Sequence, residues 1–203
     1  MQNKILGIDS VSGRSGVALI GGDGIIEERR IDHVNGRPSK NLLVEIDKLF
    51  QETKTDISEV SSVGITNGPG SLTGIRVGIS MVRGLLFESR IPVVAVNTFD
   101  AIEKASGRKN DLQAIRIRKT EWLLRTNGKI SSADEKQICD LINSVKTAAM
   151  IGSVPNEITT DLLVIETSLA RSVAEIAKNV FQFGNAMPIE QLSPFYFVEI
   201  YSK

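Results

Sequence analysis

Residues 67–78 read NGPGSLTGIRVG and join an apolar run to an amphipathic pattern. The run VSSVGIT at 60–66 predicts a buried strand, and Ser71 or Thr73 can cap a helix that continues as GIRVGISMVRGLL. Glycine inside a helix costs about 1 kcal/mol relative to alanine, so we expect Gly74 and Gly78 where another backbone comes close. The stretch therefore predicts a strand–turn–helix unit with one tightly packed helix face.

Two stripes of residues run along the predicted helix. The first is apolar at helical spacing and predicts the core face: Ile75, Ile79, Val82 and Leu86. The second begins with glycine and ends apolar: Gly74, Gly78, Met81 and Leu85. We expect the second stripe to pack on another helix, of this chain or of a partner; the alternative is an internal unit packed on its own sheet. A Walker-type phosphate loop does not fit, because no Gly-Lys-Ser/Thr follows the glycines.

Strands and helices alternate through the first hundred residues. KILGIDS, VALI and IIEERRI predict three antiparallel strands, and PSKNLLVEIDKLFQET predicts a helix with Ser39 as its cap. IPVVAV predicts a strand and TFDAIEKAS a short helix. Because strands alternate with helices, the order βββαβαβα predicts an α/β layered domain over residues 1–106.

The GRK sequence at 107–109 predicts a boundary, and residues 107–203 predict a second, smaller α/β lobe. LQAIRIRKTEWLLR is expected as one strand, followed by a hairpin turn at Asn127-Gly128. SSADEKQICDLINSVK predicts a helix capped by Ser131 or Ser132. TAAMIGSV and DLLVIET predict strands, and SLARSVAEIAKNVFQF predicts a helix, so the second half could repeat the first in shortened form.

Composition excludes several classes of protein. The 203 residues carry 24 Lys+Arg and 24 Asp+Glu, and this zero net charge argues against an overall electrostatic grip on nucleic acid. The single cysteine excludes an internal disulfide, and the single histidine, His33, excludes a metal site with two histidines. No run reaches the roughly 18–20 apolar residues of a membrane span, and MQNKILGIDS does not read as a secretory signal. We expect a cytoplasmic protein.

Small polar residues follow the first predicted strand. Asp9, Ser10, Ser12 and Gly13 resemble a phosphate-binding turn, in which Asp9 would hold a magnesium ion through water. The alternative is an ordinary hairpin turn, which uses the same residue types. A nucleotide site at Asp9, Ser10 and Ser12 is thus one hypothesis, and no metal bound directly by side chains is expected.

The segment 107–129 holds seven Lys/Arg against Asp111 and Glu121, a net charge of +5. Contact with RNA phosphate or with an acidic partner is one interpretation, and a solvated face is the other. No nucleophile is paired with a base in the sequence, and this absence indicates that the chain does no chemistry alone.

Three stretches closely resemble the TsaB (YeaZ) family: ILGIDSVSGRSGVALI at 5–20, ITNGPGSLTGIRVGISMVRGLL at 65–86 and IPVVAVNTFDAI at 91–102. SPFYF near the C-terminus is similar to the family's P-x-Y-L segment. The resemblance implies an actin/Hsp70-like (ribonuclease-H-like) α/β fold with two lobes, each a mixed sheet flanked by helices. That family takes part in making threonylcarbamoyladenosine at position 37 of transfer RNAs.

The resemblance also implies a role as a non-catalytic partner that binds the TsaD transferase, together with the TsaE ATPase. No cofactor would be required, although ATP or ADP with magnesium could bind at the complex. The helix after the glycine turn would bind TsaD or a second copy of the chain, and transfer RNA would be reached indirectly, through segment 107–129. The implied interface residues are Gly70, Ser71, Thr73, Gly74, Arg76, Gly78, Met81 and Leu85.

The chain departs from the family in two places. Pro38, Ser39 and Lys40 stand where the family often has His-Ser-Glu, and RIRKTEWLL keeps only Arg118 and Glu121 of a motif in the second lobe. A transferase of the TsaD type needs a His-x-x-x-His metal site, which a chain with one histidine lacks. A nuclease of this fold needs several carboxylates at strand ends, and Asp9 is the one convincing candidate. A small nucleotide-binding, kinase-like enzyme stays as the alternative.

Overall fold

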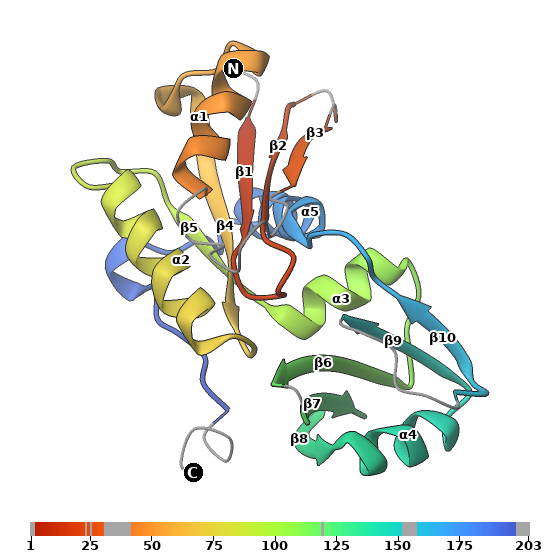
Figure 1. Cartoon of the computed structure of the whole chain (residues 1–203). Helices are drawn as coiled ribbons and strands as arrows, with labels where there is room; N and C mark the ends of the chain where they lie inside the picture. The colour runs from red at the N-terminus through yellow and green to blue at the C-terminus, as the bar shows by residue number, and fades with distance from the viewer. Residues whose placement is uncertain are drawn as a thin grey trace.

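The computed structural model describes residues 3–22, 24, 26–30, 42–118, 120–151 and 158–197. Its strands form two five-stranded sheets (Figure 1). The first sheet has the order β3-β2-β1-β4-β5 and contains β1 (Lys4–Asp9), β2 (Gly16–Ile20), β3 (Ile26–Arg30), β4 (Val60–Gly68) and β5 (Val93–Asn97). β1, β2 and β3 form an antiparallel meander, and β4 and β5 run parallel to β1. The strands predicted for the first hundred residues are confirmed.

The second sheet repeats this plan. Its order is β10-β9-β6-β7-β8, built from β6 (Leu112–Arg118), β7 (Glu121–Thr126), β8 (Lys129–Asp134), β9 (Thr147–Ile151) and β10 (Asp161–Val164). β6, β7 and β8 form a second antiparallel meander, while β9 and β10 are parallel to β6. The expectation that the second half repeats the first is therefore confirmed at the level of strand topology.

Helices cover both faces of the first sheet. α1 (Leu42–Thr53) and α2 (Leu72–Leu85) pack with the even-numbered side chains of β1, Leu6 and Ile8. α5 (Ala170–Gln182) packs on the opposite face, where a Cβ added at Gly7 would overlap Ala170 and Ala174. This division follows from the alternation of side chains along a strand.

Two further helices pack against the second sheet. α3 (Thr98–Ser106) lies between the two sheets, and its Phe99 and Ile102 share one core with Ile115 and Leu123 of the second sheet. α4 (Glu135–Asn143) covers the outer face, where Ile138 and Ile142 share a core with Trp122. In the described residues, no helix is both long and apolar enough to pass through a bilayer.

The division at residue 107 needs a correction, because residues 107–203 do not form one lobe. α5 returns to the first sheet, and after it Met187 pairs with Val93 at the free edge of β5. The short turn η3 (Ile189–Gln191) leads to Leu192, which is fully buried in the core of the first lobe. The first lobe is thus assembled from both ends of the chain.

Two other sequence predictions were wrong in detail. The expected single strand over 112–125 is two strands, β6 and β7, which pair with each other antiparallel. The helix expected from Ser131 begins at Glu135, because Asp134 caps it: the Asp134 carboxylate accepts from the backbone N–H of Gln137 at 2.8 Å. Ser131 and Ser132 lie in β8 instead. The cap expected at Ser39 lies outside the described residues, as does His33.

Candidate functional site

The start of α2 is built as the sequence predicts. Ser71 is the N-cap, and its hydroxyl accepts a hydrogen bond of 3.2 Å from the backbone N–H of Gly74. The predicted core stripe is buried at all four positions: Ile75, Ile79, Val82 and Leu86. The opposite side of α2 faces outward, with Thr73 and Arg76 exposed and Met81 and Leu85 partly buried.

The packing of Gly74 and Gly78 corrects the expectation of a partner helix on their face. A Cβ added at Gly74 would overlap the backbone oxygen of Ser10, and one added at Gly78 would overlap the Ser10 hydroxyl. At Gly70, a Cβ would overlap the side chain of Val11. The loop after β1 therefore occupies the space that these glycines leave, so the alternative of an internal unit is the correct one. Neither glycine is available to a partner.

The turn after β1, residues 9–12, is closed on itself. The Asp9 side chain is completely buried, and one of its oxygens, Oδ1, accepts from the backbone N–H groups of Val11 and Ser12 at 3.1 and 3.2 Å. Oδ1 also accepts from the Thr66 hydroxyl at 3.2 Å. The other oxygen, Oδ2, accepts from the Ser12 hydroxyl and, at 2.9 Å, from the backbone N–H of Leu169. The carboxylate thus has five donors from within the chain.

These contacts do not fit the magnesium and phosphate site considered for Asp9, Ser10 and Ser12. A carboxylate that holds a hydrated cation must present an oxygen to solvent, whereas both oxygens of Asp9 are buried and already accept hydrogen bonds. The hydroxyl of Ser10 donates to the backbone oxygen of Gly74, and that of Ser12 donates to Asp9. In this structure the side chains of Asp9, Ser10 and Ser12 are thus bonded within the chain, and the nucleotide site stays a prediction. Elsewhere in the described residues, no group of three His, Cys, Asp or Glu side chains could hold a metal ion.

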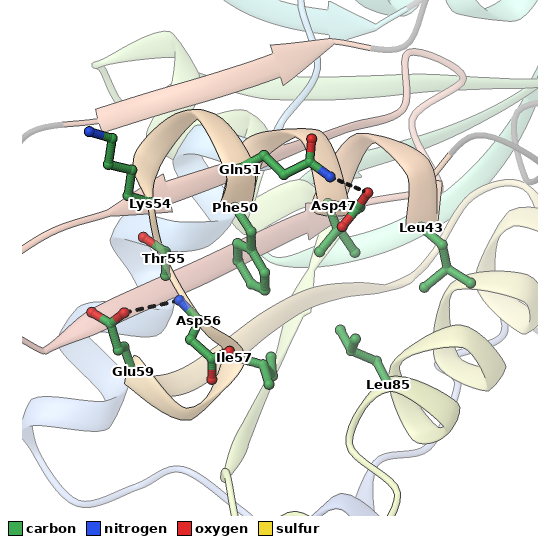
Figure 2. Close-up of a pocket in the computed structure, with 11 residues that line it drawn as sticks. Leu43, Asp47, Phe50, Gln51, Lys54, Thr55, Asp56, Ile57, Glu59 and Leu85 are labelled. Atoms are coloured by element: carbon green, nitrogen blue, oxygen red, sulfur yellow. Dashed lines mark hydrogen bonds between the residues drawn. The ribbon is translucent and has the colours of Figure 1, made fainter.

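A groove lies between α1 and the C-terminal end of α2. This α1–α2 groove has a volume of about 520 Å³. Its apolar lining comprises Leu43, Ile46, Phe50, Ile57 and Leu85, and Figure 2 shows Leu43 and Phe50 projecting from α1 toward the side of Leu85. Leu43 is 53% exposed and its neighbour Val44 is 49% exposed. Two adjoining exposed apolar side chains, Leu43 in the lining and Val44 beside it, make this part of α1 a candidate interaction surface.

Carboxylates edge the α1–α2 groove. Asp47, Asp56 and Glu59 lie on its rim, and among the described residues Lys54 is the lysine that lines it (Figure 2). The pKa of Asp56 lies below its usual value because the hydroxyl and backbone N–H of Ser58 donate to it. The pKa of Glu59 is likewise lowered, chiefly by the hydrogen bond from Lys4. The rim thus stays anionic at neutral pH around an apolar floor.

Ion pairs with β3 hold α1 in place. Arg29 of β3 donates to Glu45 at 2.7 Å and also pairs with Glu52, and the hydrogen bond to Glu45 is the main cause that raises the pKa of Arg29. Burial acts to raise the pKa of Glu45, but hydrogen bonds from Lys48 and Arg29 outweigh it, so this pKa lies below its ordinary value. One wall of the groove is therefore positioned electrostatically.

The C-terminal segment runs beside α2. Arg76 donates to the Tyr196 hydroxyl at 3.2 Å and its guanidinium lies 5.7 Å from the centre of that ring. Arg83 donates to the backbone oxygen of Leu192 at 2.8 Å. Arg76, expected at an interface, is exposed but also contacts the chain's own tail. The SPFYF sequence therefore serves to position α2.

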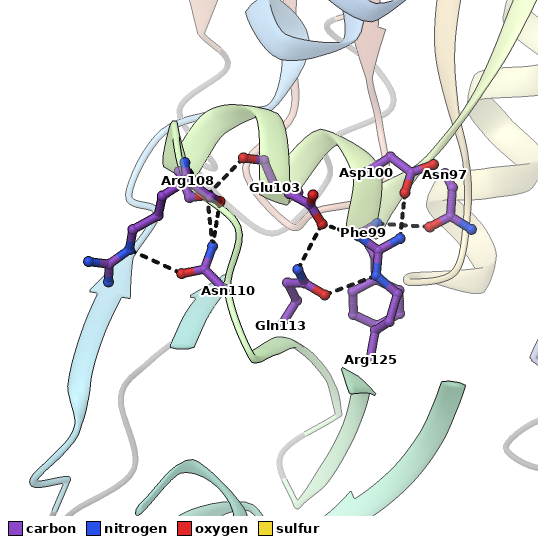
Figure 3. A network of polar contacts seen from close by, with 9 residues as sticks. Asn97, Phe99, Asp100, Glu103, Arg108, Asn110, Gln113 and Arg125 are labelled. Atoms are coloured by element: carbon purple, nitrogen blue, oxygen red, sulfur yellow. Dashed lines mark hydrogen bonds and ion pairs between the residues drawn. The ribbon is translucent and has the colours of Figure 1, made fainter. Parts of the chain in front are cut away.

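Most arginines of the basic segment 107–129 have acidic partners in the chain. Arg125 pairs with Asp100 and Glu103 of α3 and donates to Gln113 at 2.9 Å, as Figure 3 shows. Arg108 pairs with Asp161 at 2.7 Å, and Arg118 with Glu121 at 2.9 Å. These pairs account for much of the charge that suggested contact with RNA, so the interpretation as a solvated, internally paired face is the better supported one.

Sequence reasoning missed the exposed side of α1. Leu42, Ile46 and Leu49 of α1 are buried, whereas Leu43 is 53% exposed. The sequence did indicate this exposed side. Three consecutive apolar residues, Leu42, Leu43 and Val44, cannot all point to the same face of a helix, so at least one must lie outside the core stripe. The same holds at the end of α2, where Phe87 is 78% exposed after the buried Leu86.

Comparison with known proteins gives one family model and several curated relatives, each matching part of the chain. The family model described as TsaD, tRNA N6-adenosine threonylcarbamoyltransferase, matches residues 34–117. The tRNA threonylcarbamoyladenosine biosynthesis protein TsaB of Escherichia coli (strain K12) is 26% identical over 107 residues, 53% of this chain and 46% of that protein. TsaB of Haemophilus influenzae (strain ATCC 51907 / DSM 11121 / KW20 / Rd) is 30% identical over 108 residues, 52% of this chain and 44% of the other. In sequence, the chain spans somewhat less than half the length of these curated relatives.

The structural match extends through both lobes. YeaZ from Pseudomonas aeruginosa superposes with a TM-score of 0.72 at 20% identity, covering 96% of this chain and 100% of the other. With the repeated sheet topology, this match defines a two-lobed protein of the actin/Hsp70-like (ribonuclease-H-like) fold. Within that class the chain is a relative of the TsaB (YeaZ) family, and the resemblance seen in its motifs is confirmed.

Proposed function

We propose that the chain is a non-catalytic partner subunit in the synthesis of threonylcarbamoyladenosine at position 37 of transfer RNA. In this role it binds and supports a TsaD-like transferase, with a TsaE-like ATPase as a further component. Support comes from the curated relatives, which carry the name of this biosynthetic process. The cytoplasm, where such a process would meet its transfer RNA, is the proposed location.

The observation that carries the proposal is the exposed apolar α1–α2 groove. The family model for the TsaD transferase matches residues 34–117, and this range contains α1, α2 and all lining residues of the groove. A transferase that matches the same model carries a related helix pair. Two related helix pairs can pack face to face about a pseudo-twofold axis, much as identical patches do in a symmetric dimer. A TsaD-like chain is therefore the proposed occupant of the α1–α2 groove.

The proposed interface differs from the one expected from sequence alone. Leu85 and Met81 stay in it, joined by Leu43, Val44 and Phe50 from α1. Gly74 and Gly78 leave it because Ser10 covers them. A second copy of the chain could present the same face, so a homodimer is the competing occupant that experiment must separate.

The role is proposed to be non-catalytic because the carboxylate of Asp9 and the hydroxyls of Ser10 and Ser12 are all hydrogen-bonded within the chain. These groups of the turn at residues 9–12 bond to one another and to neighbouring backbone. A kinase-like enzyme of this fold would need those groups for a nucleotide, so the contacts favour the partner role. Any ATP or ADP with magnesium would bind in the assembled complex, away from this turn.

A reconstituted modification reaction tests the proposal. TsaD-like and TsaE-like proteins from the same organism are incubated with a threonylcarbamoyl donor and unmodified transfer RNA, and the modified nucleoside is measured by mass spectrometry. We expect about a tenfold or greater rise in product when the chain is added, and no product from the chain alone. Product formed by the chain alone would show that it is an enzyme and contradict the proposal.

The double variant Leu43→Glu/Leu85→Glu places two charges on the apolar floor and should remove the stimulation. Leu141→Glu is the matched control, because Leu141 is an exposed leucine, 39% exposed, on α4 in the other lobe. Stimulation that survives in the double variant would place the partner on a different surface.

A further inference from the structure

The turn of residues 9–12 touches helices on both faces of the first sheet. On one side Asp9 accepts a hydrogen bond of 2.9 Å from the backbone N–H of Leu169, which directly precedes α5. A carboxylate at this position satisfies a donor at the helix N-terminus and interacts favourably with the helix dipole. The start of α5 is thus held by a residue 160 positions earlier in the chain.

On the other side the same turn seats α2. The Ser10 hydroxyl donates to the backbone oxygen of Gly74 at 2.9 Å, and Ser10 fills the space beside Gly74 and Gly78. The backbone oxygen of Val11 accepts from the N–H of Ser71 at 3.4 Å, just where α2 begins. Because Gly74 and Gly78 have no Cβ, the turn lies closer to α2 than it could if either position carried a side chain.

A third connection ties the turn to the sheet itself. The Thr66 hydroxyl of β4 donates to Asp9 at 3.2 Å and accepts from the backbone N–H of Ser10 at 3.3 Å. β4 leads directly into the glycine turn and then into α2. The turn of residues 9–12 is therefore bonded both to β4, before the glycine turn, and to α2, after it. Asp9, Ser10 and Thr66 are all buried, and water cannot replace the bonds they make.

We infer that the turn Asp9–Ser12 is an internal coupler that fixes α2 relative to α5, in place of the nucleotide-phosphate site that its sequence suggests. α2 and α5 lie on opposite faces of the first sheet, and the turn is the element that bonds to the beginnings of both. Asp9 is a positioning residue for α2, which it reaches through the turn, because it accepts bonds from Val11 and Ser12 of the turn as well as from Thr66 and Leu169. The coupler does not depend on the proposed function; only its consequence for partner binding does, because α2 forms one wall of the α1–α2 groove.

Replacing Asp9 with asparagine breaks the coupler with little change in shape. The amide offers one acceptor oxygen and one NH₂ donor, whereas all five groups around Asp9 donate to it. The NH₂ group must then face donors, and a buried donor without an acceptor is costly. The substitution should therefore loosen the elements that Asp9 holds without leaving a cavity.

Amide hydrogen exchange of the purified chain tests the coupling. In Asp9→Asn we expect exchange about tenfold or more faster at Leu169, and also faster by a similar factor at Gly74 and Ile75, which begin α2. Exchange at Gln137, capped by Asp134 in the other lobe, should not change. Asp140→Asn, an exposed carboxylate on α4, is the matched control and should alter none of these rates. Faster exchange at Leu169 with unchanged exchange at Gly74 and Ile75 would overturn the coupling.

Two further measurements keep the inference falsifiable if Asp9→Asn does not fold. Ser10→Ala removes only the bond to Gly74, and we expect about threefold or faster exchange at both Gly74 and Leu169; an effect at Gly74 alone would contradict the coupler. The wild-type chain is also heated with Mg-ADP and Mg-ATP at about 1 mM, where we expect no shift of Tm beyond about 1 °C. A clear upward shift that Ser10→Ala abolishes would show that the turn binds nucleotide and would overturn the inference.

Discussion

The hydroxyl of Ser10 donates a hydrogen bond of 2.9 Å to the backbone oxygen of Gly74, 64 residues further along the chain. The same hydroxyl lies where the Cβ of any residue other than glycine at position 78 would stand. The glycines of α2 are thus explained by a contact inside the chain. A large residue at either position would disturb the fold itself, so such variants cannot report on partner binding.

Gly78→Ala should therefore destabilise the chain. The added methyl would overlap the Ser10 hydroxyl and approach Ile65, and overpacking of this kind costs about 1–3 kcal/mol in the free energy of unfolding. Gly84→Ala in the same helix is the matched control, because open space surrounds Gly84. It should raise the free energy of unfolding by about 0.5–1 kcal/mol, since alanine is the better helix former. Urea unfolding of both variants measures the difference, and equal effects would contradict the packing described.

Arg125 should contribute more to stability than a typical surface arginine. Its side chain is only 16% exposed, pairs with Asp100 and Glu103, and lies 5.5 Å from the centre of the Phe99 ring. Arg125→Ala leaves Gln113 and two carboxylates without this partner and should cost about 2 kcal/mol by urea unfolding. Arg118→Ala is the control, because Arg118 is 55% exposed and pairs only with Glu121; its cost should stay below about 0.5 kcal/mol. A similar loss in both variants would mean that the network in Figure 3 adds nothing.

Stability should fall in acid partly through Glu45. The folded-state pKa of Glu45 lies below its ordinary value, so its contribution is fully present above the unfolded-state pKa of about 4.3 and is lost as pH falls through the folded-state value. Thermal unfolding from pH 7 to pH 3 should show a lower Tm for Glu45→Gln than for wild type at neutral pH. The two curves should converge only as the pH falls below the lowered folded-state pKa of Glu45. Glu27→Gln, an exposed glutamate on β3, should follow wild type throughout, and curves for Glu45→Gln that never converge would rule out this origin.

Local patterns were sufficient to predict the strands β1 to β5 and the helix α2 of the first lobe. The alternation of strands and helices, the stripe from Ile75 to Leu86 and the cap at Ser71 all depend on residues close in sequence. The hairpin between β6 and β7 was not predictable in the same way, because RIRKTEW contains none of the glycine, proline or asparagine that marks a tight turn. Asp134 outcompeted the two earlier serines as the helix cap, since Ser131 and Ser132 pair with Leu124 and Leu123 of β7.

The site depends on contacts that sequence spacing cannot reveal. Asp9 meets Leu169, and Ser10 meets Gly74, only after the chain has folded. A buried carboxylate and a ligand-binding carboxylate look alike in sequence. They are distinguished by the hydrogen-bond donors that surround the carboxylate in the folded chain. Similarly, nothing local indicates that α5 returns to the first sheet, or that Leu43 points away from the core that buries Leu42.

The most direct test of the partner role is the affinity of the purified chain for the TsaD-like protein of the same organism, measured by titration calorimetry. We expect binding by wild type and by Leu141→Glu with equal Kd, and binding by Leu43→Glu weakened about 30-fold or more, as for a central residue of an interface. Binding by Leu43→Glu as tight as that of wild type would contradict the assignment of the α1–α2 groove, and the absence of any binding by wild type would contradict the partner role itself.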